Sequence, residues 1–121
     1  MNIFLDDIRN PKNMLTSEQM ENLKVFRCPR EALIFFKDHH DKIETVHLDH
    51  YLDHDRFTGG DVLERIYREK VLRGNKWNKL QTIYLHSSDE TIINRLIKKF
   101  GTELEQSGVI LINNHCKLNH A

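Results

Sequence analysis

The stretch TVHLDHYLDHDRFTGGDVLERIYREKVL, residues 45–72, places an apolar run, a polar loop and an amphipathic segment in that order. The run at residues 45–48 is too short for a helix and favours a buried strand. The loop ends at Gly59 and Gly60, and the apolar residues that follow repeat at helical spacing: Val62, Leu63, Ile66 and Tyr67. The stretch therefore predicts a strand, a polar loop and a helix.

The same alternation recurs along the rest of the chain. Further strands are predicted from short apolar runs, at residues 2–5, 24–26, 82–85 and 108–112. Pro29 opens an amphipathic helix, PREALIFFKDHH, and Asp89 caps another helix, which we expect Gly101 to terminate. Buried strands alternating with such helices predict an α/β fold whose parallel sheet is covered on both faces. We expect a doubly wound, five-stranded, flavodoxin-like sheet in the order 2-1-3-4-5.

The composition suits one intracellular domain spanning residues 1–121. The chain has 18 basic and 18 acidic residues, and a net charge of zero argues against a protein that coats nucleic acid. Cys28 and Cys116 match neither a metal-binding spacing nor a disulfide framework, so a cytoplasmic location is expected. The N-terminal sequence has no run long enough for a signal peptide or a membrane span. The polar tail after residue 112 leaves no room for a final helix.

Polar residues follow the ends of four predicted strands. These pairs are Asp6-Asp7, Asp49-His50, His86-Ser87 and Asn113-Asn114. The carboxyl ends of parallel strands meet at one edge of a sheet, where ligands bind in this fold class. We therefore expect the four pairs to converge on one site.

Asp6, Asp7 and Asp49 are the predicted metal ligands. Mg²⁺ prefers oxygen donors and keeps several waters, so two or three carboxylates suffice to hold it or the similar Mn²⁺. Without a cation, three clustered carboxylates repel one another. The alternative is that Asp6 caps a turn and Asp49 is merely exposed, but capping accounts for one acid and not for three.

The neighbouring polar residues have the chemistry of a phosphate site. Ser87 can donate a hydrogen bond to a phosphoryl oxygen, and His50 and His86 can move protons near neutral pH. Arg9 or Lys117 would neutralise charge that develops on the phosphate. Other residues are expected to lie outside the site: His47 as a structural residue, Asp53, His54 and Asp55 as solvated loop residues, and Trp77 as packing for the loop at residues 73–79.

Four motifs resemble the cyclic-phosphate-processing receiver-like domains, a small group within the receiver superfamily: FLDDIRNP (4–11), LDHYL (48–52), TGGDVL (58–63) and YLHSS (84–88). The resemblance runs from Met1 to about Ile112. It implies metal ligation by Asp6, Asp7 and Asp49, roles near phosphate for His50, His86 and Ser87, and hydrolysis of phosphoesters, including cyclic phosphates in RNA repair or conflict systems.

The sequence also departs from its relatives at two points. Tyr51 stands where relatives often carry an acid directly after the histidine. An ordinary signalling receiver has a lysine directly after its fifth strand and then a final helix, whereas here Asn113-Asn114 occupies that point and Lys117 comes later. These departures weaken a phosphorelay role.

Three functions remain open. The first is a metal-dependent phosphoesterase that hydrolyses a cyclic phosphate or phosphodiester of a nucleotide or RNA end. The second is a receiver that takes a phosphoryl group on Asp49. The third is a module that binds a nucleotide or a partner protein without catalysis. The histidines favour the first, with Asp49 and His50 inside the site and His54 and Asp55 outside it.

Overall fold

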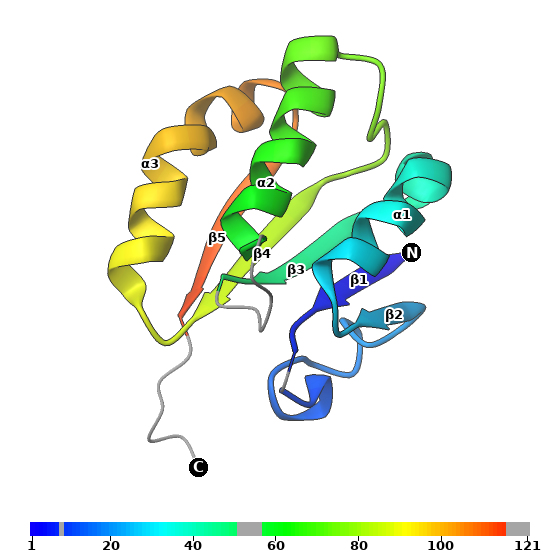
Figure 1. Cartoon of the computed structure of the whole chain (residues 1–121), viewed down its shortest axis with the longest axis vertical. Coiled ribbons are helices and arrows are strands. Elements are labelled where there is room, and N and C mark those ends of the chain that lie inside the picture. Colours follow the sequence, from blue (N-terminus) through cyan, green and yellow to red (C-terminus); the bar gives the residue numbers. More distant parts are fainter. Residues whose placement is uncertain (8, 51–56, 116–121) are drawn as a thin grey trace.

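The structure is a computed structural model, and it describes residues 1–7, 9–50 and 57–115 of the chain. Figure 1 shows a parallel β-sheet with α-helices packed against it. The sheet of the described residues has five strands in the order β2-β1-β3-β4-β5, which confirms the predicted topology. Its strands are β1 (Asn2–Leu5), β2 (Leu23–Phe26), β3 (Thr45–Asp49), β4 (Thr82–Ser87) and β5 (Ile110–His115). The α-helices are α1 (Pro29–His39), α2 (Gly59–Tyr67) and α3 (Glu90–Gln106), and the shorter helices are η1 (Pro11–Asn13), η2 (His40–Lys42) and η3 (Arg68–Arg73).

The direction in which the chain crosses the sheet decides where the helices lie. From β1 the chain moves outward to β2, and it then crosses back to β3, β4 and β5. Crossovers between parallel strands are right-handed in about 98% of cases, so a reversal of direction places the connections on opposite faces. The helices α1, α2 and α3 all belong to crossovers in the second direction, and Figure 1 shows them in front of the sheet.

The predicted doubly wound sheet is confirmed, although within the described residues the α-helices lie on one face. The winding does reverse, but the connection from β1 to β2 contains a single turn of 3-10 helix, η1, and no α-helix in its described part. That segment supplies buried Pro11 and Leu15. On this face of the sheet Phe4 and His47 are buried outside the main core.

The main core lies between the sheet and the helices. Alternate strand residues point into it, because successive side chains of a strand face opposite sides. The strand residues of this core are Ile3, Leu5, Val46, Leu48, Ile83 and Leu85. Ile93 of α3 and Ile66 of α2 are fully buried against them. Trp77 also packs here rather than on the surface: it is fully buried, its ring meets Phe36 edge-on, and its indole nitrogen donates to Glu69 at 2.9 Å.

Several predicted boundaries differ from the structure. Helix α3 passes through Gly101 and ends at Gln106, because its apolar stripe continues to fully buried Leu104. The turn that follows uses Gly108, whose φ of +95° suits glycine. Strands β4 and β5 are also longer than predicted, so that His86, Ser87, Asn113 and Asn114 lie within strands rather than after them. The predicted lack of a final helix concerns residues 116–121, which lie outside the described residues.

Within the described ranges, none of the helices has the length and apolar character needed to cross a membrane.

Candidate functional site

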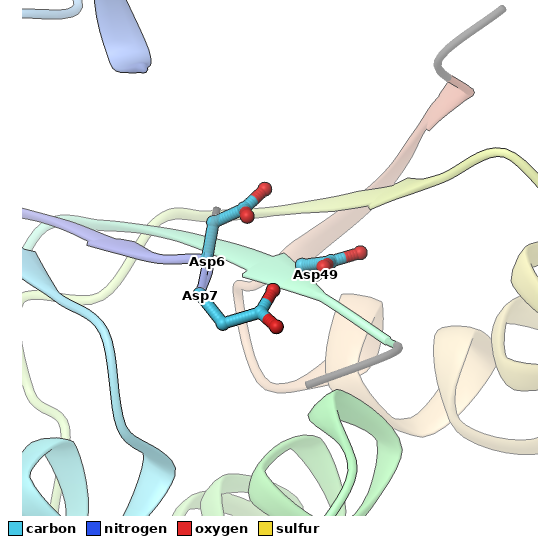
Figure 2. A group of neighbouring side chains, drawn as sticks. All are labelled: Asp6, Asp7 and Asp49. Carbon is cyan, nitrogen blue, oxygen red and sulfur yellow. The ribbon is translucent and has the colours of Figure 1, made fainter. Parts of the chain in front are cut away.

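The three predicted metal ligands meet at the carboxyl ends of β1 and β3. These strands are parallel neighbours with Leu5 paired to Leu48, so Asp6 leaves β1 beside Asp49. One carboxylate oxygen from each of Asp6, Asp7 and Asp49 lies within 4.8 Å of the others. Figure 2 shows Asp6 and Asp7 beyond the end of β1 and Asp49 on the arrowhead of β3, with the three carboxyl groups near one another. The sequence correctly predicted that these acids converge.

Burial and mutual repulsion act on this acidic cluster. Asp6 is 1% exposed and Asp49 is 5% exposed. Burial raises the pKa of Asp49 to about 6, and the charges of Asp6 and Asp7 add to the shift while Arg9 opposes it. Three hard oxygen donors at this spacing have the chemistry that Mg²⁺ and Mn²⁺ prefer. The donor set therefore fits the predicted cation.

Arg9 lies directly on the acidic cluster. Its Nη1 atom is 3.2 Å from Oδ2 of Asp6 and 3.1 Å from Oδ1 of Asp49. Its backbone N–H donates to Oδ1 of Asp6 at 2.9 Å. Arg27 holds the same turn, because its Nη1 donates to the backbone carbonyls of Asp6 at 3.0 Å and of Arg9 at 2.6 Å. The predicted phosphate ligand Arg9 is thus an immediate neighbour of the predicted metal ligands.

His86 stands next to Asp49 in the sheet. The two residues are register partners on β4 and β3, so their side chains leave the same face. Nε2 of His86 lies 2.9 Å from Nδ1 of His47, and Nδ2 of Asn114 lies 3.2 Å from Nδ1 of His86. Burial, with smaller contributions from His47 and Arg9, lowers the pKa of His86 to about 3. His86 is therefore neutral at physiological pH.

Sequence reasoning missed the part played by His47. Its ring is fully buried, as expected of a structural residue, and it stacks on Tyr84 with ring centroids 4.5 Å apart. However, His47 precedes Asp49 by two positions, so strand alternation turns both toward the same face and brings His47 to His86. The two-residue spacing between His47 and Asp49 is the sequence feature that could have predicted that both face the same side of the sheet.

The other two predicted catalytic residues lie toward the helices. The ring of His50 packs against Gly60 of α2, and burial lowers its pKa while the charges of Asp61 and Asp89 oppose that shift. Ser87 follows Leu85 toward the main core and is fully buried, and its Oγ accepts the backbone N–H of Asp89 at 3.0 Å. The structure thus places His86, and neither His50 nor Ser87, on the face of Asp49.

The TGGD motif at residues 58–61 anchors α2 against the end of β3. Thr58 and Asp61 form a reciprocal capping box, with the Thr58 N–H 2.8 Å from Oδ2 of Asp61 and the Asp61 N–H 3.2 Å from Oγ1 of Thr58. A Cβ atom on Gly59 would lie 2.7 Å from the carbonyl carbon of Asp49. Glycine at this position therefore lets the helix approach the backbone that carries Asp49.

Several predicted residues lie outside the described part of the chain: Tyr51, Asp53, His54, Asp55 and Lys117. The acidic cluster, Arg9 and the His47–His86–Asn114 chain make up the candidate site.

One known family matches the part of the chain that carries the acidic cluster. A family model described as the cyclic-phosphate processing receiver domain matches residues 1–100. Neither a curated protein nor a solved structure matches the chain. The matched range covers both strands that carry the acids, the TGGD motif and β4 with His86. The chain belongs to the family of cyclic-phosphate processing receiver domains.

Proposed function

We propose that the protein is a metal-dependent phosphoesterase that hydrolyses a cyclic phosphate or phosphodiester of a nucleotide or RNA end. The observation that carries the proposal is the convergence of Asp6, Asp7 and Asp49, whose ligand oxygens lie within 4.8 Å of one another. The association of the family with cyclic-phosphate processing supports the same substrate class.

Asp6, Asp7 and Asp49 would hold Mg²⁺ or Mn²⁺. Such an ion, when bound, polarises a phosphoryl oxygen and lowers the pKa of a coordinated water. The position of the acids also sets the edge of the sheet at which the phosphate would bind. Their negative charge repels a phosphate until a cation neutralises that charge. Arg9, whose Nη1 lies 3.1 Å from Oδ1 of Asp49, is a cation beside the acids that could bind the phosphate.

His86 is the residue that we assign to proton transfer. It shares a face with Asp49, and Asn114 occupies its Nδ1 side at 3.2 Å. A phosphate in place of the Asn114 amide would be an anion beside the ring, which raises the pKa of a histidine toward the range useful for acid–base catalysis. His47 holds the opposite ring nitrogen of His86 and so fixes the orientation of the ring.

A screen of substrates tests the proposal. Nucleoside 2′,3′-cyclic and 3′,5′-cyclic phosphates, linear dinucleotides and RNA with a terminal cyclic phosphate are incubated with Mg²⁺, Mn²⁺ or EDTA, and the products are separated by chromatography. We expect metal-dependent hydrolysis of one class, loss of activity in EDTA and loss in Asp49→Asn. Asp38→Asn, an exposed acid on α1, is the matched control and should retain activity.

The histidine variants refine the assignment. Acid–base help is worth about a hundredfold or more in rate, so His86→Ala should lower turnover by at least that factor. His54→Ala should change turnover by less than about threefold if that residue lies outside the site. Metal binding by calorimetry without turnover of any substrate would instead favour a non-catalytic binding module.

A further inference from the structure

We propose that Arg9 is a built-in counter-cation of the acidic cluster that a divalent metal displaces, so that the metal must bind before the phosphate that Arg9 then holds. This inference rests on the proposed function and specifies the order in which the same site is filled.

The contacts of Arg9 use the oxygens that a metal would need. Both carboxylate oxygens of Asp6 accept from Arg9, one from its backbone N–H at 2.9 Å and one from Nη1 at 3.2 Å. The same Nη1 lies 3.1 Å from Oδ1 of Asp49. A single guanidinium nitrogen thus bridges two of the three proposed metal ligands. A divalent ion among these oxygens would repel the guanidinium, because like charges a few ångströms apart in a buried site are only weakly screened.

The Arg9 side chain can leave without unfolding the turn that carries it. Its backbone carbonyl is held independently of the acidic side chains, because it accepts from Nη1 of Arg27 at 2.6 Å. The side chain is 28% exposed, whereas those of Asp6 and Asp49 are 2% and 6% exposed. The Arg9 side chain is therefore more accessible to solvent than the two acids that it contacts.

Release changes what Arg9 can bind. A guanidinium presents five N–H donors in a planar fork that suits the oxygens of a phosphate. While Nη1 is shared by Asp6 and Asp49, its charge is already balanced by two carboxylates. Once a metal takes over those carboxylates, the guanidinium no longer shares Nη1 with them and can turn toward a phosphate. A metal and a phosphate should therefore bind with positive coupling, and Arg9 is the residue through which they are coupled.

Calorimetric titration with Mn²⁺ alone tests the first step, with wild type, Arg9→Gln and Arg9→Lys compared at one ionic strength. Arg9→Gln removes the competing charge, so we expect it to bind Mn²⁺ at least about tenfold more tightly than wild type, a change of about 1.4 kcal/mol. Arg9→Lys keeps a cation and should stay within about threefold of wild type. Arg30→Gln removes an exposed charge from α1 as a matched control and should stay within about twofold.

Titration with inorganic phosphate tests the second step. Wild type should bind phosphate in the presence of saturating Mg²⁺ and not in EDTA, and Arg9→Gln should lose most of that binding while it still binds Mn²⁺. Equal or weaker Mn²⁺ binding by Arg9→Gln overturns the inference and leaves the metal site intact. Absence of Mn²⁺ binding in both wild type and Arg9→Gln overturns the metal site of the proposed function, and the inference fails with it.

Discussion

Two buried histidines share a hydrogen bond beside the acidic cluster: Nδ1 of His47 lies 2.9 Å from Nε2 of His86. The rings are 0% and 1% exposed, and their centroids are 5.1 Å apart. Protonation of either ring would place a charge next to its neighbour in a site from which water is excluded. Both rings are therefore held neutral, at the face from which Asp49 also projects.

This pair should make the fold sensitive to acid. Burial lowers the pKa of His47 from 6.5 to about 4, and burial together with His47 lowers that of His86 to about 3. Between those values and 6.5 the unfolded chain binds more protons than the folded one, so stability falls as the pH falls below 6.5. We expect a loss of about 1–2 kcal/mol per histidine between pH 7 and pH 5.

Urea unfolding at several pH values measures this loss. The double variant His47→Phe, His86→Phe removes both titrating rings from the aromatic cluster, and its stability should be much less dependent on pH in this range. An equally steep decline in the double variant would contradict the assignment to these two residues.

Asp49 should have the opposite effect on stability. Its pKa is raised from 3.8 to about 6, chiefly by burial, so the ionised form opposes folding and the penalty appears as the pH rises from 3.8 through 6. Asp49→Asn should therefore increase the free energy of unfolding by about 1–3 kcal/mol at pH 7.5 in EDTA, and by little at pH 4. With a bound metal, wild type should instead be more stable than Asp49→Asn, because the metal stabilises only the protein that retains the Asp49 carboxylate as a ligand. A less stable Asp49→Asn at pH 7.5 in EDTA would count against the buried charge.

Gly59→Ala should disrupt the junction between β3 and α2. The added Cβ would lie 2.7 Å from the carbonyl carbon of Asp49 and 2.9 Å from Cα of His50, and backbone atoms cannot move aside as a side chain can. We expect a loss of about 2 kcal/mol or more in denaturant unfolding, with weaker Mn²⁺ binding. Gly101→Ala is the control, because its Cβ would meet only the Ile97 side chain within α3, and its effect should be within about 1 kcal/mol. Similar losses in both variants would show that the close approach at Gly59 is unimportant.

Acetyl phosphate distinguishes the phosphoesterase from a phosphoacceptor receiver. With Mg²⁺ present, phosphorylation of Asp49 would add about 80 Da to the intact mass of wild type and nothing to Asp49→Asn. We expect no lasting adduct, because Asp49 is 5% exposed and Asn113-Asn114 stand where an ordinary receiver has its lysine. A stable adduct confined to wild type would favour the signalling role.

The element types, their order and the acidic cluster were predictable from sequence. Apolar runs of strand length, helical stripes such as Ile92–Phe100 and the cap at Asp89 are local patterns, and the Asp89 side chain does accept the N–H of Thr91. Asp6 and Asp7 follow β1 and Asp49 is the last residue of β3, so the edge common to parallel strands suffices to bring them together. No knowledge of side-chain direction was needed for any of these.

Side-chain direction and the placement of connections were decided by the tertiary structure. Either His86 or Ser87 could face Asp49, and the outcome depends on the register between β3 and β4, which continues to Ser87. In that register Asp49 pairs with His86, which lies 37 residues later in the sequence. A one-residue shift would exchange the two faces, and local sequence does not encode that register. The bridge from Arg9 to Asp49 and the His47–His86 pair likewise join separate segments. The one-sided placement of α1, α2 and α3 follows from crossover handedness combined with strand order, which is a property of the whole sheet.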